Sequence, residues 1–165
     1  AVYKVGDEFP MLSQRSMHYF RRIAELVLAP VLADDHVHIK RVATAQAASF
    51  VKVAVDTYRS GEDAIAACKP LLYEFRTYTS RTIALVQYHS ELESYIREAL
   101  APAPSRSVRR VEVYREEHQA RVIVEPGTIA QFLGRKGMNA AVASKLTGYG
   151  LVLVDEGDLG KVGGA

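Results

Sequence analysis

The sequence Gly127-Thr128-Ile129-Ala130-Gln131-Phe132-Leu133-Gly134-Arg135-Lys136-Gly137-Met138-Asn139 decides the fold of this chain. An apolar helical turn leads into Gly-Arg-Lys-Gly, and a second helix is predicted to begin near Met138. Glycines at 134 and 137 let a polyanionic backbone approach the peptide groups, and they permit positive φ. The unpaired N–H groups at the helix start favour a bound phosphate, and Arg135 and Lys136 add two positive charges. The alternative is that Gly134 only ends one helix and Gly137 loosens the next.

Composition limits the classes of protein that this chain can represent. Its 165 residues allow one domain or two small ones, and its net charge of +2 is too weak to predict nucleic-acid binding by itself. A single cysteine, Cys68, excludes an internal disulfide framework and suits a reducing compartment. It lies in an apolar helical stretch, which indicates a buried thiol. Because no apolar run approaches the roughly 18 residues that span a bilayer and no signal-peptide pattern opens the chain, we expect a cytoplasmic protein without a membrane contact.

Hydrophobic periodicity predicts an internal duplication. The order is helix, two strands, helical region and strand, twice, with a period of about 70 residues. The predicted elements lie at 13–28, 36–42, 50–55, 61–78 and 82–86 in the first copy, and at 91–100, 110–114, 121–124, 128–146 and 150–154 in the second. Strands 36–42 and 50–55 should pair as an antiparallel hairpin. Strand 82–86 is mostly apolar and is predicted to be central in its sheet.

The two copies differ in length at one place. Ala64–Cys68 matches Thr128–Phe132 at an offset of 64, whereas Thr82–Leu85 matches Leu151–Val154 at an offset of 69. The difference, 69 minus 64, is five residues, and these correspond to Leu133–Gly137 of the second copy. The first copy is therefore predicted to keep the fold and to lack the Gly-x-x-Gly turn.

A Gly-x-x-Gly turn between two helices is the feature with which KH domains clamp about four nucleotides of RNA backbone. With its tandem copy and flanking helix, the turn resembles the paired type II KH domains of the NusA family of bacterial transcription termination and antitermination factors. The resemblance rests on Leu12–Ser16, Phe20–Arg22, Val37–Ala43, Lys52–Val55, Ala99–Ala103, Phe132–Asn139 and Ala143–Gly148. It implies an α+β fold of two tandem type II KH domains, each a three-stranded mixed sheet packed against helices, the first degenerate.

The resemblance also implies a division of the chain. We expect an N-terminal segment and connecting helix at 1–33, a degenerate KH-like domain at 34–102, a second KH domain at 103–156, and a flexible tail at 157–165, which contains four glycines. By this resemblance, we expect the family's N-terminal OB-type and polymerase-binding domains to be absent or reduced to about ten residues. The chain is therefore either a fragment or a naturally short relative.

The predicted site binds single-stranded RNA without catalysis. Phosphates would lie over the turn, and bases would lie in an apolar groove walled by Ile129, Leu133 and strand 121–124. The predicted RNA-binding residues are Ile129, Leu133, Gly134, Arg135, Lys136, Gly137, Met138, Asn139 and Lys145, with Arg109, Arg110 and Arg121 as possible additional contacts. A solvated strand face is the alternative for those three arginines.

Catalytic and metal sites are not predicted. A Walker A loop needs four residues between its first glycine and Gly-Lys-Ser/Thr, and six separate Gly127 from Gly134. His36 and His38 share a strand face without a third ligand nearby. We expect no cofactor and no enzyme activity. By resemblance, the partners besides RNA are RNA polymerase and other Nus-type factors; the alternative function is a protein-interaction scaffold with little RNA binding of its own.

Overall fold

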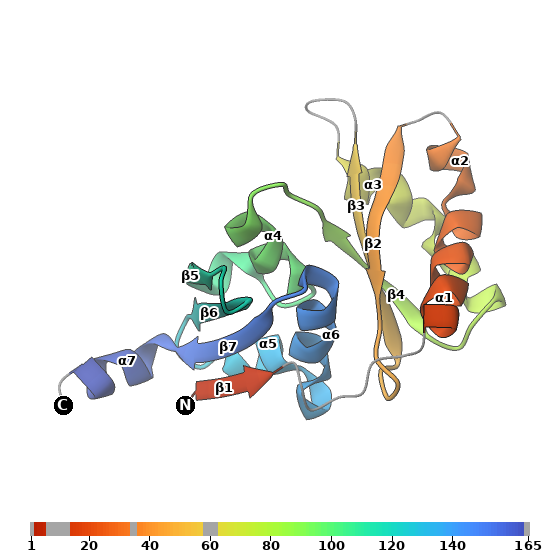
Figure 1. Ribbon diagram of the computed structural model, residues 1–165. Helices are drawn as coiled ribbons and strands as arrows, with labels where there is room; N and C mark the ends of the chain where they lie inside the picture. The colour runs from red at the N-terminus through yellow and green to blue at the C-terminus, as the bar shows by residue number, and fades with distance from the viewer. Residues whose placement is uncertain (1, 6–13, 34–35, 58–62, 164–165) are drawn as a thin grey trace.

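The computed structural model describes residues 2–5, 14–33, 36–57 and 63–163 of the chain (Figure 1). Two sheets, each covered by helices, stand side by side, and helix α6 lies between them (Figure 1). Part of the stretch Leu12–Ser16 lies outside the described residues.

The first domain has the order of elements that the sequence predicts. It contains α1 (Gln14–Val27), a short α2 (Ala29–Leu32), β2 (Val37–Ala43), β3 (Phe50–Thr57), α3 (Ala64–Cys68), the 3₁₀ helix η1 (Lys69–Thr77) and β4 (Thr82–Gln87). β3 is central, because it pairs antiparallel with β2 and parallel with β4. The prediction that strand 82–86 is central is therefore wrong. β4 lies at the edge of the sheet, and its apolar side chains pack under α3 and η1 or line a cavity.

Strand β3 is buried on both faces. Val51, Val53 and Val55 face the helices of their own domain and join a core with Cys68 and Phe75. The alternate positions point to the other face because side chains alternate along a strand, and there the second domain covers them. One of these positions is Lys52, a charged residue type.

The second domain contains the same motif with its own additions. Its elements are α4 (Leu92–Ala99), η2 (Ser105–Ser107), β5 (Val108–Tyr114), β6 (Gln119–Val124), α5 (Ile129–Leu133), η3 (Arg135–Gly137), α6 (Met138–Thr147) and β7 (Gly150–Asp155). β6 is central, antiparallel to β5 and parallel to β7. Strand β1 (Val2–Val5) adds a fourth strand, antiparallel to β7. The predicted α+β fold of tandem three-stranded mixed sheets is confirmed, with this strand added to the second sheet.

Small side chains let the two domains pack closely. Helix α6 is buried on almost all sides and carries alanines at 140, 141 and 143. They share one apolar core with alanines 43, 45, 48 and 54 of the first domain. Because both domains contribute to this one core, they form a continuous structure. Close packing of this kind resists a change of side-chain volume.

Helices α4 and α1 pack against different sheets. α4 contacts β5 and α6 and also β4 of the first domain, and the Tyr95 hydroxyl in α4 donates to the Leu146 carbonyl oxygen at 3.2 Å. We therefore describe α4, which lies within the predicted first domain at 34–102, together with the second domain. α1, within the predicted segment 1–33, packs against β2 and η1, so we describe it with the first domain.

The end of the chain is helical where a flexible tail was expected. Helix α7 spans Glu156–Gly163, and residues 164–165 lie outside the described part. The Asp155 carboxylate accepts from the backbone N–H of Gly157 at 2.8 Å and of Gly127 at 3.1 Å, and Glu156 forms an ion pair with Arg109 at 3.3 Å. These contacts tie the helix start to the domain, which the glycine content alone did not indicate.

Candidate RNA-binding site

The Gly-x-x-Gly turn, Gly134–Gly137, has a positive φ at both of its glycines. Gly134 ends α5 with φ 72° and ψ 179°, a combination almost restricted to glycine. Lys136 and Gly137 are both left-handed, with φ 57° and 74°. The Gly137 N–H donates to the Gly134 carbonyl oxygen at 3.0 Å, which closes the turn. Exposed Arg135 and Lys136 therefore stand at the start of α6.

Asn139 fixes the turn from behind. Its Nδ2 donates to the carbonyl oxygens of Phe132 and Leu100, both at 2.9 Å, and the residue is only 6% exposed. A Cβ on Gly134 would lie 2.5 Å from the Cβ of Asn139. Both amide hydrogens are used, so the amide group of Asn139 positions the turn.

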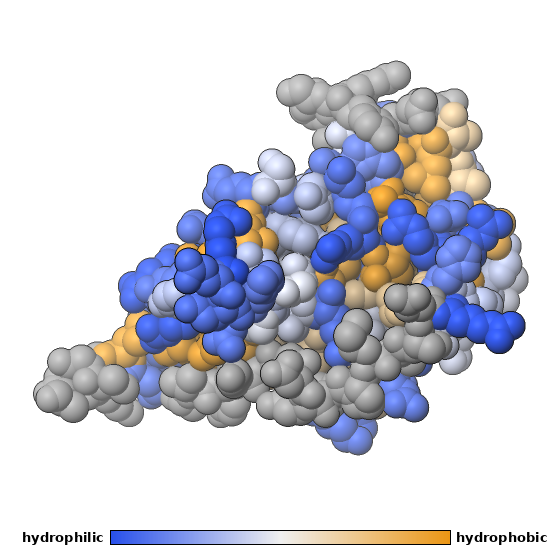
Figure 2. Space-filling view, viewed as in Figure 1, coloured by the Kyte–Doolittle hydropathy of each residue, from blue (hydrophilic) through white to orange (hydrophobic). Residues whose placement is uncertain are grey.

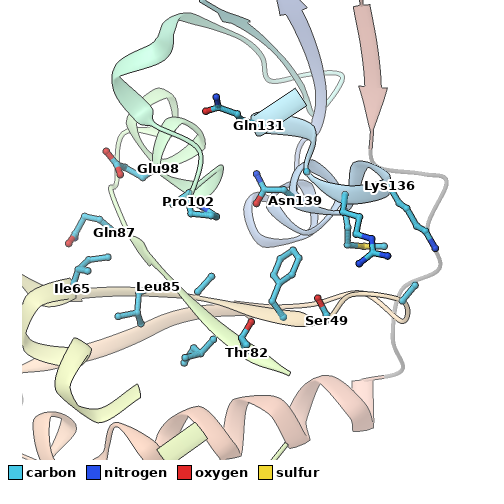
Figure 3. Close-up of a pocket in the computed structure, with 18 of the residues that line it drawn as sticks. Ser49, Ile65, Thr82, Leu85, Gln87, Glu98, Pro102, Gln131, Lys136 and Asn139 are labelled. Carbon is cyan, nitrogen blue, oxygen red and sulfur yellow. The ribbon is translucent and has the colours of Figure 1, made fainter. Parts of the chain in front are cut away.

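An interdomain cavity of about 820 Å³ opens beside the turn (Figure 3). The second domain contributes Gly134, Arg135, Lys136, Met138 and Asn139 to its lining. The facing wall is β4 of the first domain, with Thr82–Leu85 and Gln87. Ile65 of α3 and Lys69, the first residue of η1, also line the cavity. The cavity therefore joins the turn of the second copy to the corresponding region of the first.

The predicted groove wall at 121–124 is wrong. Val122, Ile123 and Val124 are fully buried in the second domain, because β6 is the central strand of its sheet. Ile129 and Leu133 are half-buried and pack against the core; neither lines the cavity. The sequence did not identify β4 as a wall because the site forms between the two copies. The signal in the sequence was the mostly apolar character of strand 82–86, which the structure places at a sheet edge.

Five of the predicted residues come together at the cavity, and the cationic residues predicted farther away do not. Lys145 is half-buried on α6 and lies outside the cavity lining. Arg109 pairs with Glu125 and Glu156, and Arg110 and Arg121 both pair with Glu112, at 3.8 and 3.5 Å. Hydrophilic side chains gather over β5 and β6 (Figure 2). This arrangement is that of a solvated strand face.

Lys52 is a positioning residue that the sequence analysis missed. Its side chain is fully buried, and its Nζ donates to the carbonyl oxygens of Ala99 at 2.6 Å and Ala101 at 2.8 Å. Burial lowers the pKa of Lys52 to about 7. The adjacent Leu100 carbonyl oxygen holds Asn139. Lys52 thus ties β3 to the same chain segment that supports the turn. The available signal was a lysine inside the apolar run Phe50–Val55.

Groups that could support other chemistry are not assembled in the described part of the chain. No cluster of three metal-ligating side chains occurs among the described residues. Burial raises the pKa of the Cys68 thiol to about 11, so it is protonated at neutral pH and inert as a nucleophile. No described helix is long and apolar enough to cross a membrane.

The fold and the turn define a tandem pair of type II KH domains. Residues 92–161 match the family model described as NusA-like second KH domain. A transcription termination/antitermination protein NusA from Halalkalibacterium halodurans is 28% identical over 158 residues, which cover 93% of this chain and 40% of that protein. Proteins of the same name from Mycobacterium tuberculosis and Bacillus subtilis are 29% and 27% identical, covering 84% and 87% of this chain and 40% and 38% of theirs. The chain therefore carries a NusA-like KH region, as the sequence predicted.

The chain spans less than half the length of these relatives. Among solved structures, the crystal structure of APE1850 matches with a TM-score of 0.55 at 16% identity, covering 88% of this chain and 100% of that one. At that identity the likeness concerns the fold alone.

Proposed function

We propose that this chain binds single-stranded RNA, with the backbone at the Gly-x-x-Gly turn and the bases in the interdomain cavity. One observation carries the proposal: the turn and its two exposed cations, Arg135 and Lys136, form one end of a cavity. Glycine lets phosphates approach the peptide groups, and the cations neutralise them.

The walls of the cavity suit unpaired bases. Phe50, Leu85, Pro102 and Met138 give it an apolar middle, on which the faces of bases can pack. β4 is an edge strand, so its backbone groups lie where base edges can reach them. Bases in single strands expose those edges, which paired RNA hides. The first domain therefore supplies a wall of the site although it lacks its own turn.

The proposed biological role follows from the NusA-like region. The chain serves in a transcription elongation, termination or antitermination factor, acts in the cytoplasm by binding without catalysis, and meets RNA polymerase and other Nus-type factors. The relatives that share the region are named for transcription termination and antitermination, which supports this role. The competing function is a protein-interaction scaffold that binds little RNA.

Charge reversal at the turn separates these functions. We expect Arg135→Asp/Lys136→Asp to weaken binding of a fluorescent single-stranded RNA about 100-fold or more, because two charge-assisted contacts become repulsive. The fold should survive, since both side chains are exposed and aspartate tolerates the left-handed conformation at 136. Fluorescence anisotropy measures the affinity, and circular dichroism checks the fold.

The matched control is Arg22→Asp/Arg76→Asp. It changes the net charge equally, at exposed positions on α1 and η1, and should lower the affinity only slightly. If both double variants bind equally well, or wild type does not bind RNA, the chain is a scaffold and the proposal fails.

A further inference from the structure

The interdomain cavity has ends of opposite character. Lys136 stands at one end, and Glu98 of α4 and Gln87 of β4 lie together at the other (Figure 3). Arg135, the neighbour of Lys136 in the turn, also lines the cavity. The rest of the lining is mostly apolar and includes one further cation, Lys69 of η1. A phosphate is attracted to the first end and repelled by the carboxylate at the second. RNA in the cavity must therefore point a base, not its backbone, at Glu98.

Glu98 is not placed there by the needs of the fold. Within the described part of the chain, no group donates a hydrogen bond to its half-buried carboxylate and no cation pairs with it. It also lies in the last turn of α4, where the negative end of the helix dipole disfavours an acidic side chain. Its carboxylate is available to a ligand that brings its own donors.

Gln87 offers an acceptor at the same end. Its Nε2 donates to Asp56 Oδ1 at 3.2 Å and to the Tyr88 carbonyl oxygen at 3.0 Å. These two bonds use both amide hydrogens, so Oε1 is the group that Gln87 can present to a ligand. Glu98 and Gln87 together make an end of the cavity that accepts hydrogen bonds.

We propose that Glu98 and Gln87 form a base-reading subsite that selects guanine. The Watson–Crick edge of guanine carries two adjacent donors, N1–H and the N2 amino group, which match the two oxygens of one carboxylate. Adenine and cytosine place a ring acceptor next to their amino group, and uracil flanks its single N–H with two carbonyl oxygens. Each of these arrangements sets an acceptor against the carboxylate. The inference rests on the proposed RNA binding and adds the base that the site prefers.

Inosine makes the test specific, because it keeps N1–H of guanine and lacks the N2 amino group. We expect oligouridine hexamers with one guest base, scanned through each position, to bind in the order guanine, inosine, adenine. Guanine should exceed adenine by about tenfold or more at one position, the discrimination typical of a bidentate contact to a base edge. Competition anisotropy on the full 165-residue chain measures the affinities.

Glu98→Gln should bring the ratio of guanine to adenine affinity close to one, because one carboxylate oxygen is replaced by an amino donor. Glu93→Gln is the matched control, with the same charge change at an exposed position of α4, and should keep the ratio. A guanine preference that survives Glu98→Gln, or a wild type without preference, overturns the inference.

The outcomes also separate the two proposals. If oligouridine binds and Arg135→Asp/Lys136→Asp abolishes that binding, RNA binding stands even where no guanine preference is found. If wild type binds none of the hexamers, the proposed function and this inference both fail.

Discussion

The two copies differ most at the joint between their two helices. In the first, the chain passes from fully buried Cys68 to Lys69 with φ −49° and ψ −45°, so the backbone stays helical into η1. In the second, fully buried Phe132 is followed two residues later by Gly134 at φ 72°, which breaks the helix. Both joints fix one apolar side chain in a core. The extra residues thus create the Gly-x-x-Gly turn, with exposed Arg135 and Lys136, while the apolar residue that precedes it stays buried as in the first copy.

The same position on the two central strands meets two environments. Counted from the start of the parallel pairing, Lys52 of β3 corresponds to Arg121 of β6, since each is the third residue in register. Lys52 is covered by the second domain and bonds to backbone carbonyl oxygens. Arg121 remains partly exposed and pairs with Glu112. The docking of one copy on the other therefore decides whether this cation is part of the core or of the surface.

The largest expected effect comes from Gly134→Ala. We predict that it lowers the free energy of unfolding by about 3 kcal/mol, because alanine at φ 72° and ψ 179° costs roughly 1–3 kcal/mol and its Cβ meets the Cβ of Asn139 at 2.5 Å. Urea denaturation measures the change.

Gly137→Ala is the matched control, because nothing lies within 4 Å of its Cβ position and only φ 74° is unfavourable. We expect a loss of about 1 kcal/mol. Equal losses in the two variants would show that Asn139 does not hold the turn closely.

The next effect concerns Lys52 and pH. Its pKa of about 7 in the folded protein lies below the ordinary 10.5, so the unfolded chain binds more protons between these values and stability rises with pH. From pH 7 to 8.5 the free energy of unfolding should increase by about 1–2 kcal/mol. Above this window Cys68 and Tyr95, with pKa raised to about 11 and 12, begin to act in the opposite direction.

Lys52→Met should remove this rise, which urea denaturation at several pH values would reveal. Arg121→Met replaces the corresponding cation of the second copy and should leave the rise intact. An unchanged pH dependence in Lys52→Met would mean that another group titrates in this window.

Most of the fold was predictable because both copies show strong periodicity. The hairpin 36–42 and 50–55 pairs as expected, and the internal duplication locates the Gly-x-x-Gly turn. Strand 82–86 misled the prediction because its apolar side chains suggested a central strand, whereas three of the four, Ile83, Ala84 and Leu85, line the interdomain cavity. The apolar pattern of a strand indicates that one of its faces is covered. It does not show whether a neighbouring strand, a helix or another domain covers that face.

The candidate site was predictable at its cationic end only. Gly134 and Gly137 are local signals, since backbone conformation dictates the residue type. The facing wall, from β4, and the end near Glu98 come from segments about 50 and 40 residues away, which only the docking of the domains brings together. The hydrogen bonds by which Asn139 positions the turn were not predictable, because a buried amide cannot be recognised in a single sequence.

The smallest effect is expected for the outer face of the second sheet. Arg110 and Arg121 share Glu112 through partly exposed ion pairs at 3.8 and 3.5 Å, and ion pairs near the surface contribute little to stability. Arg110→Ala/Arg121→Ala should change the free energy of unfolding by less than about 0.5 kcal/mol. It should also leave the salt dependence of RNA affinity unchanged, whereas Arg135→Ala/Lys136→Ala should reduce the slope of log affinity against log salt by about two. A similar reduction of the slope in both variants would mean that RNA also contacts Arg110 and Arg121, so that the binding surface extends from the turn over β5 and β6.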